Sequence, residues 1–343
     1  MMSFARMPRV IFAVGVAALL GSLAVSAHAV TIDWVTVGDP GNTADTTGAP
    51  NPAGAVADAF QIMKFEFTNQ QYKDFLNSVA ATDTYALYNA NMGLNARGGI
   101  TQSGTSGAYT YATRTNMGDK PVNYVSWFDA ARVSNWLMNG GTSSSSTETG
   151  AYTLIGGQTS GNAPAVNSGA TFYVPTENQW YKTAYYKGGS TNAGYWDYGT
   201  QSDSLPTAVT AGLTGIGSSG STGNFANYNS GADWNGQDGN VTTVGTNGGA
   251  SAYAAFDMSG NAYEWNDLTG ATGSSRGLRG GDWFSTNALP FLASSFSNSI
   301  NAATETDTFG FRLAAVPEPS TYAMALAGLA YGGYSMFRRR RVR

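Results

Sequence analysis

Three long stretches rich in Gly, Ser, Thr and Asn divide this sequence, at residues 88–118, 139–170 and 199–250. Loops of this length in a compact domain usually have a function or are held in place by a cross-link or a bound ligand. Disulfide cross-links are excluded because none of the 343 residues is cysteine. Aromatic residues make up 13% of the chain, which is too many for a disordered protein. We therefore expect a folded, loop-rich domain, and bound metal is the natural candidate for holding its loops.

The residues needed for thiol and imidazole chemistry are nearly absent. The single histidine, His28, lies in a segment that we expect to be removed. The mature protein would then have no thiolate nucleophile, no Ser–His–Asp triad and no cysteine or histidine ligand for zinc or iron. Carboxylates, lysines, tyrosines and hard cations bound by oxygen remain available.

The charge of the chain is unevenly distributed. The net charge is −4, but residues 30–315 contain 21 acidic and 11 basic side chains, because seven arginines lie in the two tails. A body with a charge of about −10 and no basic stripe is poorly suited to nucleic acid. We therefore expect no nucleic-acid partner.

Residues 1–29 have the pattern of a secretory signal peptide. Arg6 and Arg9 precede an apolar run from Val10 to Val25, and Ala27-His28-Ala29 is a small-x-small cleavage site. The alternative is a retained membrane helix, but the apolar run is short and polar residues follow at once. The pattern predicts an exported protein.

Residues 316–343 combine three features in a fixed order. Pro317-Glu318-Pro319 is followed by an uncharged stretch, Ser320–Phe337, and then by Arg338–Arg341. Eighteen residues are just enough to span a bilayer, and the arginines would stay on the cytoplasmic side. A generic tail anchor is the simpler interpretation, but the set resembles the PEP-CTERM sorting signal of Gram-negative bacteria.

That resemblance implies sorting by an exosortase. It further implies a location in the periplasm, at the cell surface or in the extracellular matrix, with at least transient anchoring in the inner membrane. The body of the protein, residues 30–315, would then lie outside the cytoplasm.

Capping boxes predict three helices in the body. They pair Thr68 with Gln71, Ser126 with Asp129, and Thr176 with Gln179. Short runs rich in β-branched and aromatic residues predict strands near these helices. These runs are Phe60–Phe67, Phe172–Val174, Val241–Val244 and Phe309–Leu313.

Two groups of carboxylates and amides lie in the later loops. Asp257 and Glu264 are seven residues apart and bracket small residues that can turn the chain, an arrangement that can supply an oxygen cage for Ca²⁺. An Asp/Asn turn entering a strand explains the same spacing equally well. The second group comprises Asn224, Asp233, Asp238 and Asn240, for which solvated loop residues are the simpler interpretation.

Several aromatic residues lie near these loops in the sequence. Packing in the core explains most of them, and a carbohydrate-stacking surface is the alternative for some. They are Tyr195, Trp196, Tyr198, Trp234, Trp265 and Trp283.

Six motifs, taken in order, resemble the sulfatase-modifying-factor domain, the fold of formylglycine-generating enzyme. They extend over roughly residues 31–315, and their order makes the resemblance specific. The motifs are Phe67–Tyr72, Pro121–Trp127, Val174–Trp180, Asp257–Trp265, Leu278–Trp283 and Gly310–Leu313. The resemblance implies an α+β domain related to C-type lectins, with little regular secondary structure and long loops.

The resemblance also implies two structural calcium sites. In the first, Asp257 and Glu264 would bind through their side chains, and Gly260 and Ala262 through their backbone carbonyls. The family usually has Asn at the first of these positions, so Asp257 adds a charge. The second would use the side chains of Asn224 and Asp238 and the backbone of Phe225 and Asn240.

The family's catalytic chemistry is not expected here. Formylglycine-generating enzyme binds copper through two cysteines, and Leu292 falls near the first cysteine position of this chain. Related iron-dependent oxidases need histidines. We therefore expect neither copper nor iron, and no formylglycine generation. An enzyme that uses other groups of the same pocket, such as Asp282, Arg279 or a tyrosine, is the alternative.

The sequence as a whole predicts an exported, calcium-stabilised domain without oxidase activity. Its expected role is binding or structural, at the cell surface or in association with exopolysaccharide or a surface protein.

Overall fold

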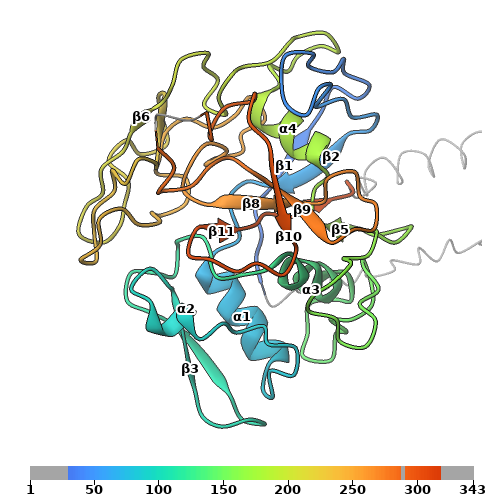
Figure 1. The fold of residues 1–343 in the computed structure, drawn as a ribbon, viewed down its shortest axis with the longest axis vertical. Helices are drawn as coiled ribbons and strands as arrows, with labels where there is room; N and C mark the ends of the chain where they lie inside the picture. The colour runs from blue at the N-terminus through green and yellow to red at the C-terminus, as the bar shows by residue number, and fades with distance from the viewer. Residues whose placement is uncertain (1–29, 287–289, 318–343) are drawn as a thin grey trace, which may run out of the picture.

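The computed structural model describes residues 30–286 and 290–317 (Figure 1). The predicted signal peptide and most of the predicted sorting segment, including Ser320–Phe337, lie outside these residues. Within the described ranges, no helix is long and apolar enough to cross a membrane.

The three predicted helices are present, and each begins at its predicted cap. Thr68 accepts a hydrogen bond from the Gln71 amide at 3.3 Å, and the Gln71 side chain accepts one from the Thr68 amide at 2.9 Å. The caps at Ser126 and Thr176 have the same reciprocal pattern. A fourth, one-turn helix was not predicted. The helices are α1 (Asn69–Val79), α2 (Asn91–Leu94), α3 (Trp127–Met138) and α4 (Glu177–Tyr185).

The strands are short and form two four-stranded sheets and two two-stranded ones. The first sheet has the order β1 (Trp34–Val37), β2 (Phe60–Met63), β12 (Ala314–Ala315), β5 (Phe172–Tyr173). The second has the order β10 (Asn298–Asn301), β9 (Ser275–Arg279), β8 (Tyr263–Asn266), β11 (Phe309–Gly310). The small sheets pair β3 (Ile100–Ser103) with β4 (Thr110–Thr113), and β6 (Thr207–Ala208) with β7 (Phe225–Ala226).

The strand predictions were partly wrong. Three of the four predicted runs contain a strand, but each strand is shorter than predicted. Val241–Val244 is not a strand, because its backbone bonds run to loops and side chains instead of to a neighbouring strand. The amide of Thr242 donates to the Asn261 side chain at 2.9 Å, and the amide of Val244 donates to the Asp119 carbonyl at 3.0 Å.

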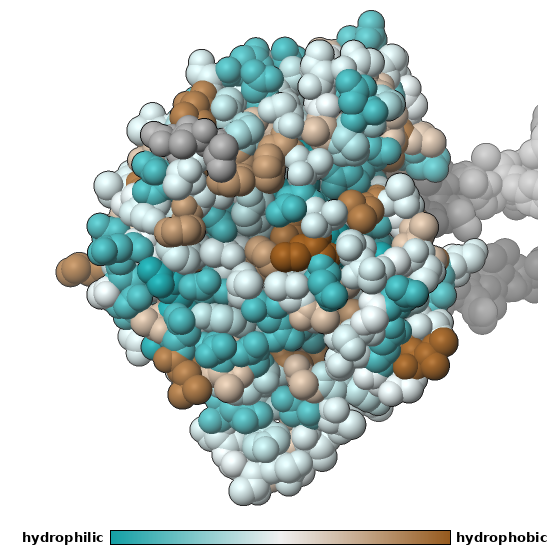
Figure 2. Space-filling view, viewed as in Figure 1, coloured by the Kyte–Doolittle hydropathy of each residue, from teal (hydrophilic) through white to brown (hydrophobic). Residues whose placement is uncertain are grey.

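The main core lies between the helices and the second sheet. Figure 1 shows α1, α2 and α3 on one side of this sheet, and α4 on the opposite side near β2. Trp127 and Trp136 of α3 are fully buried, as is Trp265 of β8. Long loops make up much of the remaining structure, so the predicted α+β fold with little regular structure is confirmed. On the face drawn in Figure 2, hydrophobic residues appear as separate spots among polar ones.

Candidate functional site

A fully buried pair of charges lies where β8 meets the segment after β11. Glu264 of β8 accepts two hydrogen bonds from the Arg312 guanidinium, at 2.5 and 2.6 Å. Its Oε2 accepts a third, from Trp180 Nε1 of α4, at 2.7 Å. Glu264 and Arg312 are both fully buried. A two-point pair of this kind fixes the direction of both side chains.

Asp257 lies in the loop before β8 and is bonded separately. One carboxylate oxygen accepts from the Gly245 amide at 2.5 Å, and the other accepts from the Asn247 side chain at 2.9 Å. Burial raises the pKa of Asp257 above its ordinary value, and these hydrogen bonds oppose that shift. Asp257 has a positive φ of 56°, which is consistent with a tight turn at this point.

Glu66, just after β2, is an acidic member of this cluster that the sequence did not reveal. Its Oε2 accepts from the Asn261 side chain at 3.0 Å, while Oε1 has no hydrogen-bond partner among the described residues. Burial, and then the charges of Asp257 and Glu264, raise the pKa of Glu66 well above its ordinary value. No spacing pattern marks this residue, because its partners are some 190 residues away.

The first predicted calcium set therefore lies in one buried, acidic region. Among the described residues, Arg312 is the cation whose charge acts on Glu66, Asp257 and Glu264, so a proton or a bound cation would balance the remaining charge of these carboxyl groups. Gly260 is held by a bond from its amide to the Gly280 carbonyl at 2.7 Å, and Ala262 is buried beside it. Both carboxylates of the set are already bonded to protein donors. In the ranges that the structure covers, no group of three acidic or histidine side chains has the geometry to hold a metal.

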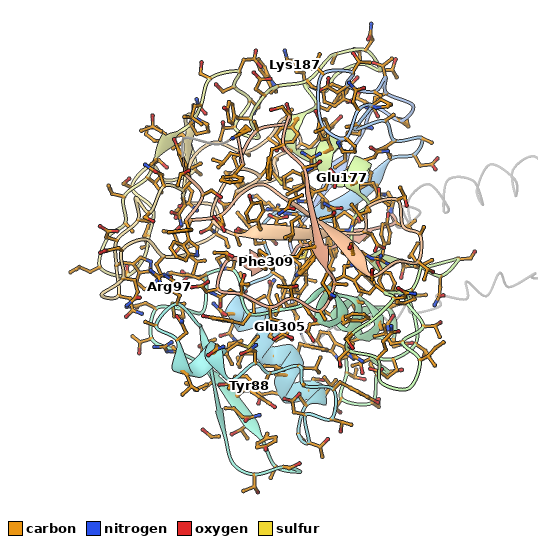
Figure 3. All side chains as sticks on the ribbon, in the orientation of Figure 1. Tyr88, Arg97, Glu177, Lys187, Glu305 and Phe309 are labelled. Carbon is orange, nitrogen blue, oxygen red and sulfur yellow. The ribbon has the colours of Figure 1, made fainter. Side chains whose placement is uncertain are left out.

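The second predicted set is held by different neighbours. Asn224 bonds to Thr200 at 2.6 Å and to the Ser204 carbonyl at 2.9 Å. The carbonyl of Asp238 instead accepts at 2.9 Å from Arg97, whose side chain is labelled in Figure 3. Asn240 accepts from Asn227 through its carbonyl. Phe225 belongs to β7. No hydrogen bond joins these four residues within the described structure, so the first set is the better candidate.

The groups that an alternative enzyme would use are bonded within the fold. The Asp282 carboxylate accepts from the Ser285 amide at 2.6 Å and from its hydroxyl at 2.7 Å, and it closes a turn. Arg279 is 1% exposed and bonds to Glu177 and to backbone carbonyls. Leu292 is buried, and its carbonyl accepts from the Tyr185 hydroxyl at 3.1 Å. The side chains of Asp282 and Arg279 thus stabilise the surrounding backbone.

The six aromatic residues near the loops do not form one surface. Trp234, Trp265 and Trp283 are buried and belong to the core. Tyr195 packs against Tyr181, with ring centroids 5.5 Å apart. The Trp196 ring is covered by the Lys187 ammonium at 4.1 Å. Packing therefore explains most of this group.

Comparisons with known proteins agree with this architecture. Residues 26–316 match the sulfatase-modifying factor enzyme 1-like domain, and residues 315–341 match the PEP-CTERM protein-sorting motif. Because the first match covers most of the chain, the protein belongs to the sulfatase-modifying-factor family. The sorting motif supports export and exosortase-dependent sorting in a Gram-negative bacterium. No curated protein matches the chain.

Three solved structures are similar to this chain, each with 18% sequence identity. CarF covers 84% of it with a TM-score of 0.49, and 99% of CarF is covered in turn. Variable protein 1 of Treponema denticola covers 83% of this chain with a TM-score of 0.47, and 95% of that protein is covered in turn. PvdO of Pseudomonas aeruginosa covers 83% of this chain with a TM-score of 0.41, and 92% of PvdO is covered in turn.

Proposed function

We propose that this protein is an exported binding or structural member of the family that has lost the oxidase chemistry. The observation that carries this proposal is that Asp282 and Arg279 are buried and bonded within the fold, and that position 292 is held by leucine, which has no reactive group. The absence of cysteine from the sequence removes the thiolate ligands that copper needs. Its expected setting is the cell surface or the exopolysaccharide, after transient anchoring in the inner membrane through residues 320–337.

Oxygen consumption tests the loss of the oxidase. The purified protein is incubated with cysteine-containing peptides, with and without added copper, and oxygen uptake is recorded. We expect no uptake above the peptide blank in either case. Copper-dependent uptake that requires the protein would refute the proposal and favour an enzyme with a different set of ligands.

Structural calcium is the second part of the proposal. Asp257 and Glu264, with the carbonyls of Gly260 and Ala262, would hold the ion, which would supply the positive charge that three buried carboxylates and one arginine lack. What supports this is the unpartnered Oε1 of Glu66 in that cluster. A ligand that binds only the folded state raises the melting temperature as its concentration rises.

The calcium test is a melting series. The protein is stripped with chelator and melted at increasing CaCl₂ concentrations, beside the Asp257→Asn and Asp257→Ala variants and an exposed control, Asp58→Asn. We expect the wild-type protein and the control to gain stability, Asp257→Asn to keep part of the gain because it retains an oxygen ligand, and Asp257→Ala to lose most of it. An unchanged wild-type melting temperature in excess Ca²⁺ would remove this part of the proposal.

Glycan-array binding tests the exopolysaccharide role. A negative array would favour a structural role.

A further inference from the structure

Three asparagines in the long loops are followed directly by glycine. They are Asn139, Asn235 and Asn247. In such a pair the glycine amide can approach the asparagine side chain closely, because glycine has no Cβ to obstruct it. Attack of that amide nitrogen on the side-chain carbon expels ammonia and leaves a succinimide ring. In a folded protein the reaction depends on how firmly the side chain and the glycine amide are held.

The first pair, at the end of α3, is held at both reacting groups. The Asn139 side chain donates to three backbone carbonyls, at 2.7, 2.9 and 3.1 Å. The Gly140 amide donates to the Leu137 carbonyl at 3.0 Å. Attack at this pair would first require these bonds to break.

The third pair is held in the same way and is also buried. Asn247 is 3% exposed, and its side chain accepts from the Thr242 hydroxyl at 2.6 Å and donates to Asp257 at 2.9 Å. The Gly248 amide donates to a backbone carbonyl at 3.0 Å. Reaction here would require local opening of the loop.

The middle pair, Asn235-Gly236, is exposed at both residues. Among the described residues, neither the Gly236 amide nor Oδ1 of Asn235 forms a hydrogen bond, and the side-chain nitrogen donates to the Ala96 carbonyl at 2.9 Å. The two residues form the tip of a turn, with φ of 55° and 70°, which a bond from the Gln237 amide to the Trp234 carbonyl closes at 3.1 Å. Beyond its two chain neighbours, no heavy atom lies within 4 Å of the place that a Cβ on Gly236 would take. A succinimide ring therefore has room to form.

We propose that Asn235-Gly236 is a site of spontaneous deamidation in the folded protein. The amide nitrogen of Gly236 forms a bond to Cγ of Asn235, its proton passes to water, and the side-chain nitrogen leaves as ammonia. Water then opens the ring at either carbonyl, which gives aspartate or isoaspartate at this position. The reaction is a hydrolysis and needs no oxidant or reductant. The inference depends neither on the calcium site nor on the proposed role.

The reaction would change how one loop is attached to another. The Asn235 side chain links residues 231–239 to the Ala96 carbonyl, and the Arg97 guanidinium donates to two carbonyls of the same loop at 2.9 and 3.0 Å. An ionised aspartate at position 235 has no donor for the Ala96 carbonyl. Isoaspartate also adds a carbon atom to the backbone of the turn. Both products therefore loosen the attachment of residues 231–239.

Ageing the full chain at mildly alkaline pH, which favours attack by the amide nitrogen, tests this site. Mass spectrometry of proteolytic peptides follows conversion at each pair, and methylation by an isoaspartyl methyltransferase measures isoaspartate. We expect Asn235 to convert at least about tenfold faster than Asn139 and Asn247 in the folded protein, because those two pairs must first open. In urea the three rates should agree within about threefold, since the fold no longer protects any pair.

Two outcomes of the ageing experiment overturn the proposal. One is conversion of Asn139 or Asn247 in the folded protein as fast as that of Asn235. The other is a difference between the pairs in urea as large as in the folded protein, because local sequence instead of the fold would then select the site.

Variants assign the signal and its consequence to this turn. Asn235→Gln should abolish most of the isoaspartate signal, because glutamine would have to close a larger ring. Asn192→Gln, a matched change at an exposed asparagine that precedes alanine, should leave the signal unchanged. Hydrogen exchange of residues 231–239 should become faster on ageing of the wild-type protein and not on ageing of Asn235→Gln. An isoaspartate signal that persists in Asn235→Gln refutes the site, and unchanged exchange in the aged wild-type protein refutes the loosened attachment.

Discussion

Removing the Arg312 guanidinium is the most direct test of the buried charge cluster. In Arg312→Met the apolar stem is kept, while Glu264 loses the donors at 2.5 and 2.6 Å and the carbonyls of Met63 and Phe256 each lose one. Glu264 would then share a fully buried site with Glu66 and Asp257 without a protein cation. Breaking a buried ion pair on one side costs about 3–5 kcal/mol.

That cost can be converted into a melting temperature. A domain of roughly 290 residues unfolds with an entropy of about 0.6 kcal/mol per kelvin, so a loss of about 3–5 kcal/mol lowers Tm by about 5–8 °C. The assay is thermal unfolding followed by circular dichroism at constant calcium. Lys73→Met is the matched control, because Lys73 pairs with Asp74 at the surface and its loss should cost less than about 1 kcal/mol.

If Arg312→Met melts within about 2 °C of the wild-type protein, the cluster is not a buried ion pair of the stated strength. If added Ca²⁺ restores the loss fully, a metal ion can replace the guanidinium charge. Full rescue would also strengthen the calcium proposal, whereas no rescue would separate the two.

Three further predictions concern single side chains. Burial, and then the charge of Glu305, raise the pKa of Asp129 to about 8, so its contribution to stability is present below pH 4 and is lost as pH rises toward 8; Asp129→Asn should therefore flatten the change in Tm between pH 5 and pH 8. Ser126→Ala removes the cap of α3 and should cost about 1 kcal/mol, or about 2 °C in Tm, and a larger loss would contradict a purely capping role. Trp180→Phe removes the Nε1 bond to Glu264 and should cost about 1.5–3 kcal/mol in denaturant unfolding, whereas an unchanged midpoint would show that the bond is weak.

The sequence was sufficient for those parts of the fold that depend on nearby residues. A capping box involves residues three positions apart, so the starts of α1, α3 and α4 could be predicted correctly. The strands were overestimated because apolar runs such as Val241–Val244 look alike whether their amides meet a strand or a side chain. In this fold Thr242 meets Asn261, 19 residues away, and no local pattern predicts such a bond.

In the candidate site, too, the residues close together in the sequence could be predicted, and the distant ones could not. The stretch from Asp257 to Glu264 could be recognised because its spacing is local and resembles a known motif. Arg312 and Glu66 could not be assigned to it, since they are 48 and about 200 residues from Glu264 along the chain. The predicted calcium ligands were considered without the guanidinium that bonds one of them, and only the fold reveals that competition.

Buried arginines provide some of the links that hold the long loops of this protein in place. Without cysteine, loops need other links, and metal was the candidate that the sequence offered. In the structure, Arg276 bonds to the carbonyls of Ala163 and Pro164 at 3.0 and 2.8 Å, and Arg312 bonds to that of Phe256 at 2.8 Å.

Each of these guanidiniums also pairs with a buried carboxylate, Asp267 or Glu264. One arginine thus links a distant loop to a strand, and its charge is balanced by the carboxylate with which it pairs. This pairing allows the protein to bury several charged side chains, although only 12% of its residues are charged. Because a guanidinium has five donors and a disulfide joins only two points, such a link can hold three segments at once. Loss of one arginine should therefore loosen several loops together.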